Sequence, residues 1–191
     1  MKKVAVFVGS LHAESINIEF AKALAKLADS SLEFNFIEIS DLPHYDDAHW
    51  ASPPASVLRL KDDIAAADAV LFVTPEFNRS IPGMLKNAID WGSRPWGQNS
   101  WAGKPGSIIG TTPGATGTSA AQAHLRSIMV ILEVALLGQP EVYFQTTPGL
   151  IDGDFEITDA ETRAFLEGYL SRFEAWIERL APEERRAIAA E

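Results

Sequence analysis

The stretch AVLFVTPEFNRSIPGMLKNAIDW, residues Ala69–Trp91, contains a strand pattern, a loop pattern and a helix pattern in that order. Its first residues, Ala69–Thr74, are almost continuously apolar, as in a strand buried on both faces of a parallel sheet. Turn-forming residues follow, and Leu85, Ala88 and Ile89 then recur at helical spacing. The stretch therefore predicts one strand-loop-helix unit of a parallel α/β sheet.

The same alternation extends in both directions along the chain. Further short runs have the composition of strands, namely Val4–Val8, Phe34–Ile39, Ser107–Gly110 and Val142–Gln145. Helical stripes separate them, including a long one from Leu125 to Leu136, and Thr158 with Glu161 predicts a capping box before the last helix. This order predicts a three-layer, doubly wound α/β domain. Five parallel strands favour the flavodoxin-like order 2-1-3-4-5, with a ligand beside strands 1 and 3.

Length and composition limit the remaining choices. The 191 residues predict one domain over residues 1–181, followed by a charged tail at 182–191. The absence of cysteine excludes disulfides and thiolate metal sites, and a net charge of -10 argues against nucleic-acid partners. The chain lacks an apolar run of membrane-spanning length, and no signal-peptide pattern follows Met1-Lys2-Lys3. We therefore expect a cytoplasmic protein without a membrane partner.

The loop after the first strand, Gly9–Asn17, combines short polar side chains with the start of a helix. Ser10, Ser15 and Asn17 offer hydrogen-bonding groups, and His12 can add a positive charge. Because the first amides of a helix attract anions, the loop predicts a phosphate site. A bland alternative is that Ser15 or Asn17 only caps the helix.

The loops after the third and fourth strands can complete such a site. In Thr74–Gly83, backbone amides can hydrogen-bond the edge of a flat heteroaromatic ring, and Phe77 can pack on it. The alternative is a structural loop whose entry and exit are set by Pro75 and Pro82. In Gly110–Thr118, small residues allow a ligand to approach the backbone, although a flexible connection explains them equally well.

Taken together, these loops resemble the NADPH-dependent FMN reductase family, in its chromate- and quinone-reductase branch. Gly9–Asn17 resembles the family's phosphate loop G-S-L-R-x-x-S-x-N, and Pro75–Trp91 follows P-E-Y-N-x-S-I-P-G-x-L-K-N-A-I-D-W almost throughout. The resemblance covers residues 2–180. It implies a flavodoxin-like fold, bound FMN, NADH or NADPH as electron donor, and a homodimer or tetramer.

The resemblance also implies the site residues. Around the FMN phosphate it places Ser10, His12, Ser15, Asn17 and Ile18. Beside the isoalloxazine and ribityl it places Pro75, Glu76, Phe77, Asn78 and Ser80, and near the pyrimidine edge Pro113, Gly114 and Ala115. Arg79 stands in the cofactor loop and Arg94 after the following helix; both are candidates for the nucleotide or acceptor side, Arg94 in the site of a partner subunit. No catalytic side chain is expected, because the flavin carries the chemistry.

Two positions depart from the family pattern. His12 replaces an arginine, so it lacks the permanent charge and the bidentate fork of a guanidinium. Since histidine loses its positive charge toward neutral pH, FMN retention is expected to be weaker than usual above about pH 7. Phe77 replaces a tyrosine and loses its hydroxyl.

The aromatic and histidine residues outside the loops have simpler interpretations. The resemblance places the helix Met84–Trp91 in the dimer interface, and Trp91 is expected to bury dimer surface there. Trp96 and Trp101 suit either the interface or an acceptor pocket. The group His44, Asp46, Asp47 and His49 can suit a divalent metal, but a solvated loop explains it better, and no metal site is predicted. His124 is interpreted as a surface or interface residue.

The resulting hypothesis is an FMN-dependent NAD(P)H:acceptor oxidoreductase. Hydride from the nucleotide reaches flavin N5, and a small-molecule acceptor then takes the electrons in a ping-pong cycle. Quinone, ferric chelate, chromate and free flavin are the candidate acceptors. The alternative is a flavodoxin-type electron carrier, which shares FMN and the fold but does not oxidise NAD(P)H.

Overall fold

The computed structural model describes residues 1–181, so the predicted charged tail at 182–191 lies outside the described residues. Six strands form one sheet: β1 (Lys2–Val8), β2 (Leu32–Phe36), β3 (Ala69–Val73), β4 (Pro105–Thr112), β5 (Ala135–Leu136) and β6 (Val142–Gln145). The helices are α1 (Ile16–Leu27), α2 (Ala55–Ala66), α3 (Gly83–Gly92), α4 (Ser119–Ile131), α5 (Ala160–Leu180) and the short 3-10 helix η1 (Asp47–Ala51).

The predicted strand order is confirmed, because the sheet runs β2-β1-β3-β4-β5 with parallel pairing throughout. The fifth position is divided between two strands. β5 pairs with β4 at Pro105 and Gly106, and β6 pairs with the same strand from Ile109 to Thr112. The edge next to β4 is therefore built from two short pieces rather than one strand.

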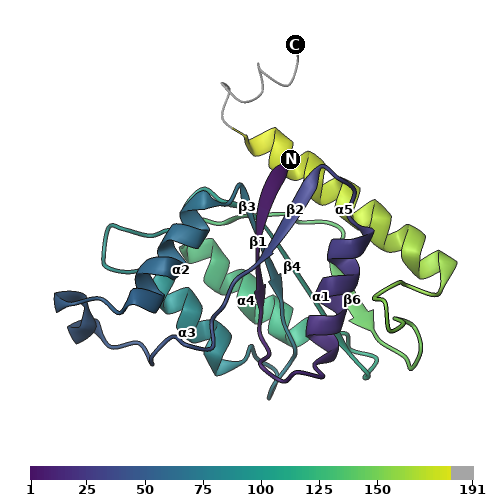
Figure 1. The fold of residues 1–191 in the computed structure, drawn as a ribbon, viewed down its shortest axis with the longest axis horizontal. Coiled ribbons are helices and arrows are strands. Elements are labelled where there is room, and N and C mark those ends of the chain that lie inside the picture. Colours follow the sequence, from purple (N-terminus) through teal and green to yellow (C-terminus); the bar gives the residue numbers. More distant parts are fainter. Residues whose placement is uncertain (182–191) are drawn as a thin grey trace, which may run out of the picture.

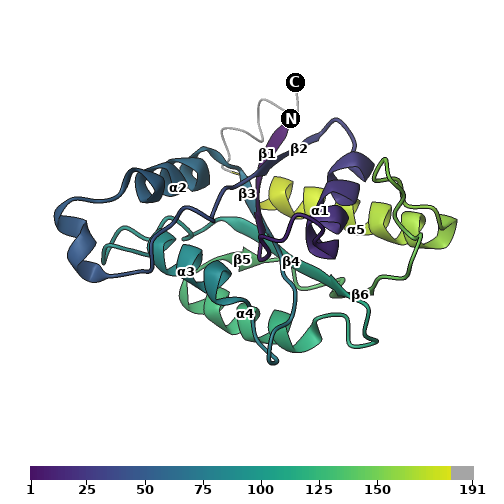
Figure 2. The ribbon, with the colours of Figure 1, turned by 60° about the horizontal axis from the view of Figure 1, so that its bottom comes forward.

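The helices form two layers around this sheet. Figures 1 and 2 show α1 and α5 on one face and α2, α3 and α4 on the other. Phe20 and Leu166 belong to the apolar core of the first face, and Leu60 and Leu125 to the core of the second. Both faces of β3 are buried, as its continuous apolar run predicted. No helix in the described part of the chain is long and apolar enough to cross a membrane.

Three local predictions are wrong. The predicted long helix stripe ends at Ile131, since Glu133 adopts a left-handed φ of 60° and the residues beyond it enter β5. β2 begins at Leu32, two residues before the predicted start at Phe34, and ends at Phe36 rather than at Ile39. The last helix is capped by Asp159, which accepts from the Thr162 amide at 2.7 Å, rather than by Thr158.

The tryptophans correct another expectation. Trp91 has no exposed surface within a single chain, so the prediction that it buries dimer surface is wrong. Tyr45 and Trp50 pack edge-on against its ring, and its Nε1 donates to the Pro43 carbonyl at 2.8 Å. Trp101 is equally buried, whereas Trp96 is 89% exposed. Of Trp91, Trp96 and Trp101, only Trp96 therefore has a ring that a ligand or a second copy of the chain can contact.

Candidate functional site

The loops after β1, β3 and β4 meet at the carboxyl edge of the sheet. The Gly9 amide donates to the Val73 carbonyl and the Thr74 amide to the Ile109 carbonyl, both at 2.9 Å, so each loop leaves its strand in register with its neighbour. A Cβ on Gly9 would lie 3.2 Å from Leu85 and 3.3 Å from Pro75. Glycine therefore permits the close contact between the first loop and the start of α3. This edge is the topological switch point at which such sheets bind ligands.

The first loop presents the start of α1 as an anion site. Ser15 caps the helix by accepting from the Asn17 amide at 3.3 Å, and the Ser15 amide donates to the His12 carbonyl. The exposed His12 accepts from the Glu14 amide through Nδ1 at 3.2 Å, which leaves Nε2 available for a ligand. Because the first amides of an α-helix lack intrahelical partners, these groups suit a phosphate.

Asn17 is placed differently from the exposed loop residues around it. Only 2% of its surface is exposed, and its side-chain amide pairs with the backbone of Thr111 on β4. Nδ2 donates to the Thr111 carbonyl and Oδ1 accepts from the Thr111 amide, both at 3.0 Å. The residue thus joins the first loop to the end of β4, which the sequence did not predict.

The second loop contains a tight hairpin. Phe77 and Ser80 exchange two backbone hydrogen bonds of 2.9 Å, while Asn78 and Arg79 between them have φ angles of 52° and 61°. Two consecutive left-handed residues are the mark of a type I′ turn. The hairpin leaves Phe77 59% exposed, so its ring is available to pack on a planar ligand.

Two side-chain contacts join this hairpin to α4. The Glu76 carboxylate accepts from the Ala120 and Ala121 amides at 2.9 and 3.1 Å. It serves as the cap of a helix whose own N-cap residue, Thr118, has a φ of 64° and makes no side-chain cap bond in the described structure. At the other end of the hairpin, Ser80 Oγ lies 2.7 Å from His124 Nδ1.

The third loop is exposed at Pro113, Gly114 and Ala115 and supported from below. Gln145 donates to the Pro113 carbonyl at 2.8 Å. The fully buried Gln122 donates to Thr118 Oγ1 at 3.1 Å and to the Val142 carbonyl at 2.8 Å. The sequence did not predict the buried role of Gln122, because a polar residue in a helical pattern is typical of the solvent-exposed face.

The donors at this edge fit FMN. The α1 end offers hydroxyls and amides suited to a phosphate, the hairpin offers an exposed ring, and the third loop offers exposed backbone. Thr111 Oγ1 is also buried at the end of β4 without a hydrogen-bond partner among residues 1–181, so a polar ligand can satisfy it. Gly114 has no side chain and little packed against it, so a flat ring can approach its backbone.

The candidate arginines lie at opposite edges of the sheet. Arg79 is exposed in the hairpin at the carboxyl edge, whereas Arg94 follows α3, which runs back toward the amino edge. The Arg94 guanidinium lies 5.9 Å from the Trp96 ring. Lys61 donates to the carbonyls of Arg94 and Gln98 at 2.7 and 2.8 Å, and its burial lowers its pKa. One chain therefore does not bring the two arginines together.

The histidine and aspartate group near η1 has local structural roles. Asp46 caps η1 by accepting from the Ala48 amide, and Asp47 accepts from the Tyr45 hydroxyl at 3.0 Å. Within residues 1–181, no group of three or more histidine, cysteine, aspartate or glutamate side chains could hold a metal ion.

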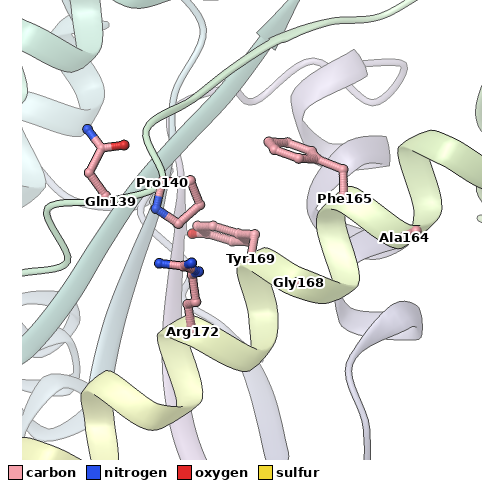
Figure 3. Close-up of a pocket in the computed structure, with 7 residues that line it drawn as sticks. All are labelled: Gln139, Pro140, Ala164, Phe165, Gly168, Tyr169 and Arg172. Atoms are coloured by element: carbon pink, nitrogen blue, oxygen red, sulfur yellow. The ribbon is translucent and has the colours of Figure 1, made fainter.

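A shallow hollow lies elsewhere, between α5 and the segment that separates β5 from β6. Figure 3 shows Tyr169 and Pro140 at its centre, with Phe165, Arg172 and Gln139 around them. Tyr169 donates to Ser107 Oγ at 2.8 Å, and burial raises its pKa well above the ordinary value. The lining residues of this hollow lie outside the three loops, so it is separate from the candidate site.

Comparisons with known proteins agree with this arrangement. The model of the NADPH-dependent FMN reductase family matches residues 2–149. The chain belongs to the NADPH-dependent FMN reductase family. A 2-hydroxy-1,4-benzoquinone reductase from a Burkholderia species is 47% identical to it over 92% of this chain and 96% of the relative. A quinone reductase from Pseudomonas putida is 46% identical over 91% and 94%.

A solved structure supports the same assignment. FerB, a flavoenzyme NAD(P)H:(acceptor) oxidoreductase from Paracoccus denitrificans, superposes with a TM-score of 0.92 at 50% identity, over 94% of this chain and 98% of FerB. The predicted flavodoxin-like fold, the enzyme class of oxidoreductase, and FMN with NAD(P)H as cofactors are confirmed for this FMN reductase family member.

Proposed function

We propose that this FMN reductase family member is an NAD(P)H:quinone reductase that uses its nucleotide and its acceptor in turn at one site. The convergence of three loops at the carboxyl edge of the sheet carries the proposal, since the start of α1, the exposed Phe77 ring and the exposed backbone of the third loop belong to this edge. Quinones are the favoured acceptors because relatives at 46–47% identity bear quinone reductase names. Ferric chelates, chromate and free flavin are further acceptors that an open site can admit.

The residues of the chain bind and orient rather than react. Ser10, His12, Ser15 and the first amides of α1 would hold the FMN phosphate, with Ile18 beside them. When bound, FMN supplies the two-electron chemistry that the side chains lack. The loop Pro75–Ser80, with Arg79 at its tip, would border the isoalloxazine and ribityl. Pro113 and Gly114 would line the pyrimidine edge, and the backbone amide of Ala115 would stabilise negative charge there, as preorganised amides do.

The supporting residues keep these loops in place. Asn17 and Glu76 use their side chains on the backbone of β4 and α4, so we assign them to positioning rather than to direct contact through those side chains. Because Arg94 lies at the amino edge of its own sheet, its predicted role toward the acceptor requires a second copy of the chain. We therefore propose a homodimer, or a tetramer built from dimers, together with this role of Arg94. A cytoplasmic location is proposed with it, since a chain without cysteine suits a reducing compartment.

Absorbance spectroscopy tests the proposal directly. The purified protein, incubated with FMN and freed of excess, should show flavin bands that bleach under anaerobic NADH or NADPH and recover on addition of benzoquinone. Double-reciprocal plots of initial rates should be parallel, as a ping-pong cycle requires. Flavin bands that persist with both nucleotides would instead support an electron carrier, and intersecting lines would exclude the ping-pong order.

A further inference from the structure

His124 occupies a position on α4 that relates it to the flavin-site hairpin. Ala120 and Ala121, whose amides bind Glu76, lie four and three residues before it, so the first turns of α4 contact both ends of the hairpin. Its Nδ1 lies 2.7 Å from Ser80 Oγ, the last residue of that hairpin. The hairpin is thus held before its first residue by Glu76 and at its last residue by His124.

The hairpin needs such support. Asn78 and Arg79 both adopt left-handed backbone, which asparagine tolerates but which is unfavourable for Arg79. The turn itself supplies two backbone hydrogen bonds, and an isolated hairpin of this size is marginal in water. We therefore expect the contacts with α4 to stabilise the conformation of the turn.

We propose that His124 is a positioning residue of the flavin site, which fixes the hairpin and sets the direction of the Ser80 hydroxyl. With Nδ1 as acceptor, the Ser80 proton is used and its oxygen can accept from a ligand. With a proton on Nδ1, the Ser80 oxygen accepts and its own proton can be donated to a ligand. The tautomer of His124 thus determines which polar group Ser80 presents. This role rests on the proposed placement of FMN beside the hairpin.

FMN binding by four variants tests the role. His124→Ala should weaken FMN binding about fivefold, the effect of one net hydrogen bond, and Ser80→Ala at least as much, because it also removes the hydroxyl that Ser80 presents to the ligand. The double variant should bind no more weakly than Ser80→Ala alone, because His124 acts only through the Ser80 hydroxyl. His124→Asn should stay within about twofold of the wild type, since its amide can replace Nδ1. Ser127→Ala is the matched control, because that hydroxyl donates to the His124 carbonyl one turn further along α4.

The dissociation constants are measured by quenching of flavin fluorescence, and the visible flavin spectrum of each complex is recorded. A changed band shape in His124→Ala that His124→Asn restores supports positioning. Wild-type affinity and spectrum in His124→Ala and Ser80→Ala, or losses that simply add in the double variant, would overturn the role of His124 while leaving the proposed function intact. Failure of the wild type to bind FMN would overturn both.

Discussion

Replacing Asn17 with alanine distinguishes a scaffold residue from a phosphate ligand. The substitution leaves the buried amide and carbonyl of Thr111 without partners. Each unpaired buried group costs about 1–3 kcal/mol, so we expect the cofactor-free protein to lose about 3 kcal/mol of unfolding free energy. For a chain of this size that corresponds to a fall in Tm of about 6–12 °C.

Asn17→Asp refines the same test. One carboxylate oxygen can still accept from the Thr111 amide, but the other faces the Thr111 carbonyl in a site that is only 2% exposed. Burial and this repulsion raise the pKa of the new carboxyl in the folded state, so its destabilising effect is present at pH 8 and diminishes as pH falls toward 5.

Urea unfolding of the cofactor-free variants measures both effects, and fluorescence titration measures FMN affinity. Leu58→Ala is a control of similar size change at a half-exposed position on α2. An Asn17→Ala protein within about 1 kcal/mol of wild-type stability, yet with strongly weakened FMN binding, would refute the scaffold role and restore Asn17 as a direct phosphate ligand.

Other sites allow further predictions. Glu76→Ala should cost about 2 kcal/mol of unfolding free energy and Glu76→Gln about half of that in urea unfolding, because the neutral amide oxygen can still cap α4; a Glu76→Gln protein as stable as the wild type would contradict a charge-assisted cap. Gly110→Ala should abolish soluble expression, since its Cβ would lie 2.1 Å from the Thr74 carbonyl oxygen, whereas Gly153→Ala, with open surroundings, should express normally. Arg94→Ala should raise KM for benzoquinone several-fold in steady-state assays, whereas Arg172→Ala, in the hollow beside α5, should leave KM unchanged. A wild-type KM in Arg94→Ala would contradict a role of Arg94 in acceptor binding. Lys61→Met should speed hydrogen exchange at Arg94–Gln98, because it removes the donor to those two carbonyls, and unchanged exchange would show that the loop is held by other contacts.

Local patterns predicted the sheet because its strands are short apolar runs with polar boundaries. Ala69–Val73 is buried on both faces, and its composition alone indicates this. β5 could not be predicted in the same way, since Ala135 and Leu136 continue the apolar spacing of α4. The backbone turn at Glu133, which separates the two elements, leaves no mark in hydrophobic periodicity.

The loops of the site were predicted from their residue types, but the contacts that support them were not. Glu76 and its amide partners are 44 and 45 residues apart, and Asn17 and Thr111 are 94 residues apart. Periodicity and capping patterns describe neighbours within a few residues, so pairings of this kind become visible only in the folded chain. The burial of Trp91 was not predicted for the same reason, because the residues that pack against its ring, Tyr45 and Trp50, are distant in sequence.

The divided edge of the sheet affects how the protein behaves at high concentration. An edge strand with a long row of unpaired amides and carbonyls invites a strand from another molecule, which leads to aggregation. Here the edge consists of two residues in β5 and four in β6. The segment Gly138–Glu141, which contains Pro140, lies between these two strands. Since proline offers no amide to a ladder, a foreign strand finds no continuous template along this side. The interruption therefore protects this edge of the sheet against edge-to-edge association.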